Sequence, residues 1–285
     1  MKTYLSLIAI DLKLAARLRA VIFFNYLFPL IFFFIFGMIF RARRDPGMAA
    51  YVLTMSVSLG VLGNGLFGAG IRALQEREMN ILRRYKVTPI TPVPLLVASM
   101  VTGLFVFLPY MVLVICLAHF IYHMPWPGHL PSLLIFISIG LIAFRAIGLV
   151  IASVANTMQE GTILVQLCYF PMLFLSGATV PPTIFPQFLQ IVSNFIPATY
   201  LVSGMQGILL KGEGLFHDRM WVIALVVTAA VGLAVGTKLF RWEKEEKIRG
   251  SAKLWVVVAL VPFLLLGIYQ SLTGHNVVRV DILGR

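Results

Sequence analysis

Residues 72–86 read RALQEREMNILRRYK and carry five basic and two acidic side chains, in a chain that is otherwise mostly apolar. Apolar segments long enough to cross a bilayer flank this stretch at residues 48–71 and 95–121. Because charged side chains are costly inside a bilayer, the stretch must lie in water at the end of two membrane spans. Its apolar residues recur at helical spacing, so we expect a helix at the membrane surface.

The composition indicates an integral membrane protein. The 285 residues are 60% hydrophobic and only 12% charged, with a mean hydropathy of +0.94. A soluble domain has about 25% charged residues. The net charge of +12 comes from short basic segments between apolar runs, a pattern typical of loops beside anionic lipid headgroups. We therefore expect the lipid bilayer, and no nucleic acid, as a partner.

The hydropathy pattern predicts an all-α protein with six core transmembrane helices and, at residues 2–19, a basic amphipathic helix in the membrane interface. A seventh apolar run, residues 254–272, is expected to be a further transmembrane helix or a helix on the membrane surface. We divide the chain into a transmembrane domain, residues 1–245, and a C-terminal extension, residues 246–285. The six core spans are expected at residues 20–40, 48–71, 95–121, 132–155, 161–175 and 220–239.

Residues 176–200, SGATVPPTIFPQFLQIVSNFIPATY, carry no charge but several helix breakers. Irregular backbone at membrane depth persists only where it is buried in protein or lines a cavity. An ordinary extracellular loop would be more polar. We therefore predict a pair of short re-entrant helices that dip back into the outer leaflet.

The distribution of Lys and Arg among the short loops predicts the orientation. The side that holds the N-terminus and residues 72–94, 156–160 and 241–253 carries 14 basic residues, against 7 on the opposite side. The N-terminus and the charged stretch are thus expected to be cytoplasmic, in a multi-pass protein of the inner membrane. Arg41, Arg43 and Arg44 lie on the opposite side and conflict with this rule.

Arg145 lies near the middle of the predicted span 132–155, where a charge costs about 3 kcal/mol. No Asp or Glu lies mid-span elsewhere to pair with it. Two interpretations stay open. In the first, Arg145 faces an internal cavity or a subunit interface; in the second, it bonds backbone carbonyls or Gln166, or it lies less deep in the membrane than its position in the span indicates. The absence of mid-span carboxylates also disfavours an ion-coupled carrier.

Sequence motifs for catalysis and metal binding are weak. His119 and His123 lie four residues apart, but no clear third ligand accompanies them, so no metal is expected. The chain has no G-x-x-x-x-G-K-[ST] phosphate loop and no convincing nucleophile–base pair. We expect a transport protein and not an enzyme, with no cofactor on this chain.

Two stretches resemble the type-2 ABC transporter permeases, the membrane subunits of ABC exporters. Glu76-Arg77-Glu78, followed by Leu82-Arg83-Arg84 and Thr88-Pro89, resembles the family's segment after the second span. Leu175-Ser176-Gly177, Pro181, Pro186, Leu189-Gln190 and Pro197-x-Thr199-Tyr200 resemble its segment after the fifth span. The order and spacing cover residues 1–245. Asn80 departs from the family pattern, which often has Gly there.

The resemblance implies that residues 72–88 form a cytoplasmic coupling helix, which docks on a separate ATPase subunit that binds ATP and Mg. The turn at residues 156–160 would be a second contact, and a second permease copy would complete a homodimer. Nine residues are implied in the contact with the ATPase: Glu76, Arg77, Glu78, Asn80, Arg83, Arg84, Thr88, Asn156 and Glu160. Six are implied in the re-entrant segment on the outer side: Ser176, Gly177, Pro181, Pro186, Pro197 and Tyr200.

The predicted function is the permease of an ATP-driven ABC exporter, which moves a hydrophobic or amphipathic substrate, a drug-like molecule or a lipid, out of the cytoplasm. A glycan exporter is the alternative within the family. Outside the family, the alternatives are an ion-coupled secondary transporter or channel that works without an ATPase, and a membrane-embedded enzyme.

Overall fold

The computed structural model describes residues 2–17, 23–86, 91–181, 184–217, 219–243, 245–246 and 254–273. These residues form helices and connecting turns, with no strand among them, which confirms the all-α prediction. The helices are α1 (Lys2–Arg17), the π-helix η1 (Phe23–Leu27), α3 (Phe28–Ile39), α4 (Pro46–Leu62), the π-helix η2 (Gly63–Ile71), α5 (Arg72–Glu78), α6 (Ile81–Lys86), α7 (Pro92–Tyr122), α8 (Leu130–Val154), α9 (Met158–Leu175), α10 (Gln187–Ser193), α11 (Pro197–Leu210), α12 (Arg219–Lys238) and α13 (Leu254–Thr273).

Four helices in the described part of the chain are long and apolar enough to cross a membrane. They are Pro46–Glu78, Pro92–Tyr122, Leu130–Val154 and Arg219–Lys238. Shorter apolar helices occur at Asn25–Ile39 and Leu260–Leu272. Helix α9 covers the predicted span at residues 161–175, and residues 20–22 of the first predicted span lie outside the described residues. The protein is therefore multi-pass, while the count of six or seven spans stays a prediction.

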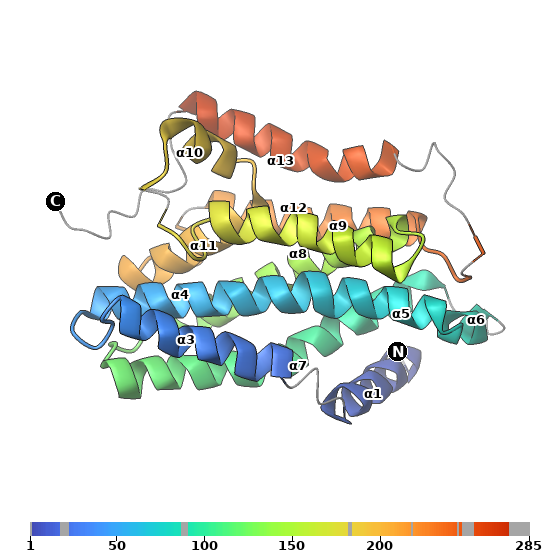
Figure 1. Ribbon diagram of the computed structural model, residues 1–285, viewed down its shortest axis with the longest axis horizontal. Coiled ribbons are helices and arrows are strands. Elements are labelled where there is room, and N and C mark those ends of the chain that lie inside the picture. The colour runs from blue at the N-terminus through green and yellow to red at the C-terminus, as the bar shows by residue number, and fades with distance from the viewer. Residues whose placement is uncertain are drawn as a thin grey trace.

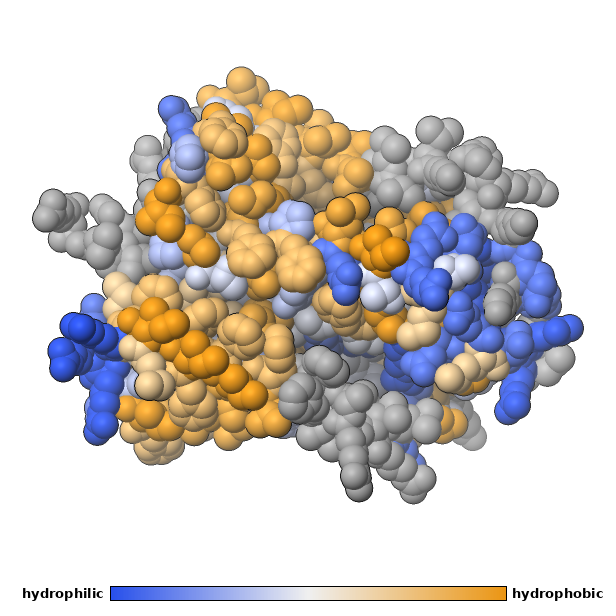
Figure 2. Space-filling model, in the orientation of Figure 1, coloured by the Kyte–Doolittle hydropathy of each residue, from blue (hydrophilic) through white to orange (hydrophobic). Residues whose placement is uncertain are grey.

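The long helices run side by side, and the polar surface gathers at their two ends (Figure 1, Figure 2). At one end lie α5, α6, the start of α9 and the end of α12 (Figure 1, right). At the other end α3 turns into α4 (Figure 1, left). The surface between the ends is largely hydrophobic on the face shown in Figure 2. This distribution suits a bilayer around the middle of the molecule.

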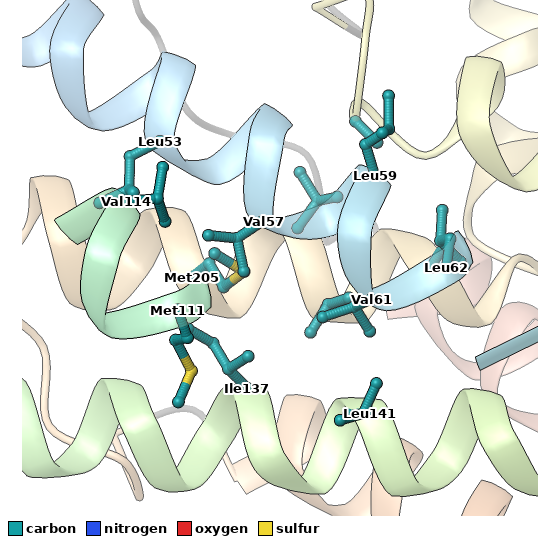
Figure 3. Packing of buried hydrophobic residues seen from close by; sticks show 14 of the residues in the cluster. Leu53, Val57, Leu59, Val61, Leu62, Met111, Val114, Ile137, Leu141 and Met205 are labelled. Carbon is teal, nitrogen blue, oxygen red and sulfur yellow. The ribbon is translucent and has the colours of Figure 1, made fainter. Parts of the chain in front are cut away.

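The interior is formed mainly by α4, η2, α7, α8 and α11. Figure 3 shows Leu53 and Val57 of α4 close to Met111 and Val114 of α7 and to Met205 of α11, all of them buried. Helix α8 packs on η2 on one side and on α12 on another. Because small residues allow close approach of helices in lipid, this packing depends on glycines.

The backbones of η2 and α8 lie close together at glycines. A Cβ built on Gly148 would lie 2.5 Å from the carbonyl oxygen of Gly65, and one on Gly70 would lie 2.8 Å from the carbonyl oxygen of Gly148. Both neighbouring atoms belong to the backbone and cannot rotate away. The glycine-rich segment of the second predicted span thus sets the spacing of the core.

The single helix predicted at residues 72–88 requires correction. The structure has one continuous helix from Pro46 to Glu78, a turn at Met79 and Asn80, and then α6. Asn80 adopts a positive φ of 56°, which no residue inside an α-helix has. Asn tolerates this left-handed conformation better than most residues because its short polar side chain can bond locally. Asn80 therefore supplies the turn that glycine would form.

The predicted re-entrant segment, residues 176–200, contains the short helix α10 and only the first turn of α11, which continues to Leu210; the two helices are bent by 93° at residues 194–196. The depth of this bent pair in the membrane stays a prediction. The N-terminal amphipathic segment forms helix α1, which packs on α7. The seventh apolar run forms helix α13, which lies along α12 (Figure 1). Whether α1 lies in the interface and α13 spans the membrane also stay predictions.

Candidate coupling surface

Two segments that are far apart in the sequence meet at the polar end of the helices. Oε1 of Glu78, the last residue of α5, accepts a hydrogen bond of 2.7 Å from the backbone N–H of Met158, the first residue of α9. A carboxylate is favoured here because the first N–H groups of a helix have no partner within the helix and carry partial positive charge. Residues 72–86 and 156–160 thus form one surface, which we call the coupling surface.

Arg77 lies on the buried side of α5 and joins α5 to the end of α8. Its guanidinium donates hydrogen bonds to the carbonyl oxygens of Ala152, at 3.0 Å, and Ala155, at 2.5 Å. The last carbonyls of a helix have no partner within the helix, so a cation there is favourable. Arg77 is only 3% exposed. It therefore supports the surface from inside, whereas the resemblance implied direct contact with a partner.

Arg241, just beyond α12, adds a second cation to the same place. It donates to the carbonyl oxygen of Ala155, to Oδ1 of Asn156 at 3.0 Å and to the carbonyl oxygen of Glu246 at 2.8 Å. Burial lowers the pKa of Arg241, while the carboxylates of Glu160 and Glu246 raise it. Helix α12 is thereby held to the turn between α8 and α9.

The turn at residues 156–160 is itself built by side-chain caps. Oγ1 of Thr157 accepts a 3.1 Å hydrogen bond from the N–H of Glu160, and Oε2 of Glu160 accepts one of 2.8 Å from the N–H of Asn156. This reciprocal arrangement resembles a capping box, which starts a helix at a defined residue. Asn156 and Glu160 remain exposed beside Glu78.

Glu76 forms an ion pair with Arg72, which also pairs with a carboxylate of α1. Its Oε1 lies 2.8 Å from Nε of Arg72, and Nη2 of Arg72 lies 2.7 Å from Oδ1 of Asp11 in α1. Arg77 and Glu78 thus bond α8 and α9 directly, whereas Glu76 is connected to α1 only through Arg72. Only the tertiary structure assigns these partners.

The side chains that are free to meet another protein lie in the turn and in α6. Asn80, Arg83 and Arg84 are exposed, and so is the apolar side chain of Met79, at 61%. Thr88 lies outside the described residues. Of the nine residues predicted for ATPase contact, the structure therefore brings Glu78, Asn156 and Glu160 together and leaves Asn80, Arg83 and Arg84 open to solvent.

Residues of the predicted re-entrant segment are distributed unevenly. Ser176, Gly177, Pro197 and Tyr200 are buried, Pro181 is half-buried and Pro186 is exposed. The hydroxyl group of Tyr200 donates to the carbonyl oxygen of Asn194 at 2.8 Å, and Thr199 bonds that of Ser193 at 2.7 Å. These two bonds close the bend between α10 and α11.

Arg145 lies in a buried polar cluster between helices. Its guanidinium donates to Oδ1 and the carbonyl oxygen of Asn64, at 2.6 and 3.3 Å, and to Oγ of Ser99 at 3.0 Å. The amide of Asn64 in turn donates to Oδ1 of Asn25. The interpretation that Arg145 bonds a carbonyl is thus correct, although Gln166 is not its partner among the described residues.

Sequence reasoning missed Asn64, Ser99 and Asn25. A signal was available, because a polar side chain inside an apolar span is costly and marks a buried interaction. Asn64 lies in the π-helix η2 and Asn25 in the π-helix η1. π-Helical turns inside α-helices are frequent at functional sites.

His119 has an ordinary role in packing, and His123 is an exposed residue that ends α7. Nδ1 of His119 lies 2.8 Å from the carbonyl oxygen of Met124, and its ring centroid lies 4.5 Å from that of Trp126. Within the described residues, no three His, Cys, Asp or Glu side chains are grouped so that they could hold a metal ion.

Comparison with known proteins connects this architecture to a family. The profile described as "ABC-2 type transporter" matches residues 3–210. The chain belongs to this family. The family resemblance found in the sequence is therefore confirmed, and the protein is a multi-pass ABC transporter permease of the inner membrane.

Several curated permeases are similar to this chain. The inner membrane transport permease YhhJ of Escherichia coli K12 is 27% identical over 206 residues, which cover 72% of this chain and 54% of YhhJ. The probable multidrug ABC transporter permease YbhS of the same organism is 26% identical over 169 residues, 59% of this chain and 43% of YbhS. The linearmycin resistance permease protein LnrN of Bacillus subtilis is 26% identical over 124 residues, 43% of this chain and 32% of LnrN. This chain spans about half the length of YhhJ.

Proposed function

We propose that this chain is the permease subunit of an ATP-driven exporter. A separate ATPase subunit, which binds ATP and Mg, docks on the coupling surface and drives a hydrophobic or amphipathic substrate out of the cytoplasm. Two copies of the permease form the path as a homodimer. The names of YbhS and LnrN, which refer to multidrug transport and linearmycin resistance, support this class of substrate.

The observation that carries the proposal is the hydrogen bond between Glu78 and the start of α9. It unites the two segments for which contact with an ATPase was predicted. A displacement of α6 and the adjoining α5 by a partner would be transmitted to α8 through Arg77 and to α9 through Glu78. Movement would also pass along the continuous helix Pro46–Glu78 into the glycine-packed core.

The contact itself is assigned to exposed groups. Arg83 and Arg84 offer charge, and Met79 and Ile81 offer apolar area beside it. An aliphatic centre with a charged rim is typical of protein–protein contacts. Glu76, Arg77 and Glu78 hold the surface in shape instead, since each bonds within the chain.

Charge reversal at two exposed residues tests the proposal. The chain is purified in mild detergent from the cells that express it, and phosphate-loop ATPases that co-purify are identified and assayed for ATP hydrolysis. We expect the double variant Arg83→Glu/Arg84→Glu to lose the ATPase. The matched control Arg43→Glu/Arg44→Glu makes the same charge change at the opposite end of the molecule. We expect this variant to keep the ATPase.

Transport in vesicles completes the test. Vesicles with the permease and its ATPase should move an amphipathic fluorescent dye only when ATP is present. Dye transport by the purified chain alone, driven by an ion gradient and without any ATPase, would overturn the proposal in favour of a secondary transporter.

A further inference from the structure

The three arginines of the α3–α4 turn lie beside a pocket between the C-terminal ends of α3 and α7. The pocket measures about 440 Å³. Apolar and basic side chains line it together: Phe34, Met38, Ile121 and Tyr122 with Arg41, Arg43 and Arg44. This end of the molecule is opposite the coupling surface (Figure 1). The inference is therefore independent of the proposed contact with an ATPase.

The backbone of the α3–α4 turn has a conformation that is unusual for an arginine. The N–H of Ala42 bonds the carbonyl oxygen of Gly37 at 3.0 Å, and that of Arg41 bonds Met38 at 3.3 Å, the pattern of a Schellman motif. Arg41 occupies the left-handed position of this motif with φ 50°, where glycine is usual. The backbone conformation disfavours arginine at this position, so the guanidinium of Arg41 is a candidate for a role outside the turn.

The arginines also lack internal compensation. All three are exposed, and within the described residues no carboxylate forms an ion pair with them. The neighbouring Asp45 is engaged as the N-cap of α4, where Oδ1 accepts a 2.8 Å hydrogen bond from the N–H of Gly47. The turn therefore has a net positive charge beside the pocket, which an anion would neutralise.

The other half of the pocket is apolar and continuous with the outer surface of α3. Met38 is 80% exposed, and Phe34 and Ile35 are exposed on the same helix. A hydrophilic tip borders hydrophobic surface at this end of the molecule (Figure 2). Such a boundary corresponds to the level of lipid headgroups. A free anion would leave the apolar half unfilled, whereas an amphiphile fits both halves.

We propose that this pocket binds an anionic phospholipid of the leaflet that faces the α3–α4 turn. The phosphate lies among the three arginines, whose planar guanidiniums suit phosphate oxygens. One acyl chain lies against Phe34 and Met38. The lipid also accounts for the conflict with the charge rule, because the three positive charges on this side are neutralised by a bound partner.

Native mass spectrometry of the full chain in detergent tests the proposal with phosphatidylglycerol and phosphatidylcholine of equal chain length. We expect tighter binding of phosphatidylglycerol, by about tenfold or more, since each basic residue near a surface adds about a factor of five in affinity for anionic lipid. The variant Arg41→Gln/Arg43→Gln/Arg44→Gln should lose this preference. Equal binding of both lipids by the unaltered chain, or an unchanged preference in the variant, would overturn the site.

Two further variants separate the pocket from general attraction of charges. Ile121→Trp fills the pocket and keeps the net charge, so it should weaken the binding of phosphatidylglycerol, and an unchanged affinity would contradict the pocket. Arg41→Gly removes one guanidinium in a turn that favours glycine. It should unfold at no lower temperature than the original chain, yet bind phosphatidylglycerol several-fold more weakly. Unchanged binding by this folded variant counts against the proposal.

A competition experiment distinguishes a lipid from a soluble anion. Inorganic phosphate at millimolar concentration should leave bound phosphatidylglycerol in place, because phosphate cannot replace the acyl-chain contacts. Complete displacement by inorganic phosphate would show that the arginines form a site for a soluble anion and would refute the lipid assignment.

Discussion

Glu78 and the backbone N–H of Met158 are joined by a 2.7 Å hydrogen bond, although they lie 80 residues apart in the chain. This single contact attaches the end of the helix Pro46–Glu78 to the beginning of α9. Because a helix N-terminus carries partial positive charge, the contact depends on the negative charge of Glu78 as well as on its shape.

Replacement of Glu78 by lysine should therefore separate the two helices. A cation would face the unpaired N–H groups of α9, which reverses a contribution of about 1 kcal/mol. We expect Glu78→Lys to lose ATP-driven transport while ATP hydrolysis by the partner continues. Glu78→Gln, which keeps an oxygen acceptor, should retain much of the transport. Full coupled transport by the lysine variant would contradict the role given to this contact.

The turn at Asn80 predicts a simple contrast in stability. Asn80→Gly should leave the melting temperature in detergent unchanged or slightly higher, because glycine adopts a positive φ without steric cost. Asn80→Val should lower the free energy of unfolding by about 1–2 kcal/mol, because a β-branched side chain is strained in this conformation. Equal stability of the two variants would show that residue 80 does not form the turn.

The buried cluster around Arg145 predicts an asymmetry between its members. Asn64→Leu removes the side-chain oxygen closest to Arg145 and leaves a buried cation with one acceptor fewer, which should cost about 1.5–3 kcal/mol. Arg145→Gln removes the buried charge itself. It should therefore lower the free energy of unfolding by less than Asn64→Leu does. Thermal unfolding of the two variants in the same detergent measures the difference. The reverse order would mean that Ser99 and the backbone carbonyl of residue 64 are sufficient partners for Arg145.

The contact between Gly65 and Gly148 predicts which glycines are essential. Gly148→Ala places a methyl group 2.5 Å from a backbone oxygen, so η2 and α8 must separate, at a cost of about 1–3 kcal/mol or more. Gly236→Ala is the matched control in α12, where the nearest atom is a side-chain carbon 3.9 Å away. This control should be neutral or slightly stabilising, since alanine favours helix. Similar melting temperatures for both variants would argue against backbone contact.

Much of the protein was predictable from local properties of the sequence. Hydropathy and charge identified an all-α membrane protein, and the Glu76-Arg77-Glu78 motif with the proline-rich segment indicated the family. These inferences succeed because the length and polarity of a segment decide whether it lies in lipid or water, and each can be read from neighbouring residues.

The partners of the charged side chains were decided only by the tertiary structure. Residues 72–86 were expected to form one surface helix. Because helix hydrogen bonds continue wherever the backbone allows, the helix of the second predicted span extends to Glu78, and the positive φ of Asn80 forms the turn that follows. Arg77 and Arg145 bond groups 46 to 81 residues away, several of them backbone carbonyls. Every residue type has such a carbonyl, so local sequence cannot specify these partners. By itself, the sequence placed a charged segment, residues 72–86, at the end of the helices, because charge is costly in lipid. The tertiary contacts of Arg77 with α8 and of Glu78 with α9 decided which of its side chains hold the protein together and which remain free to bind another.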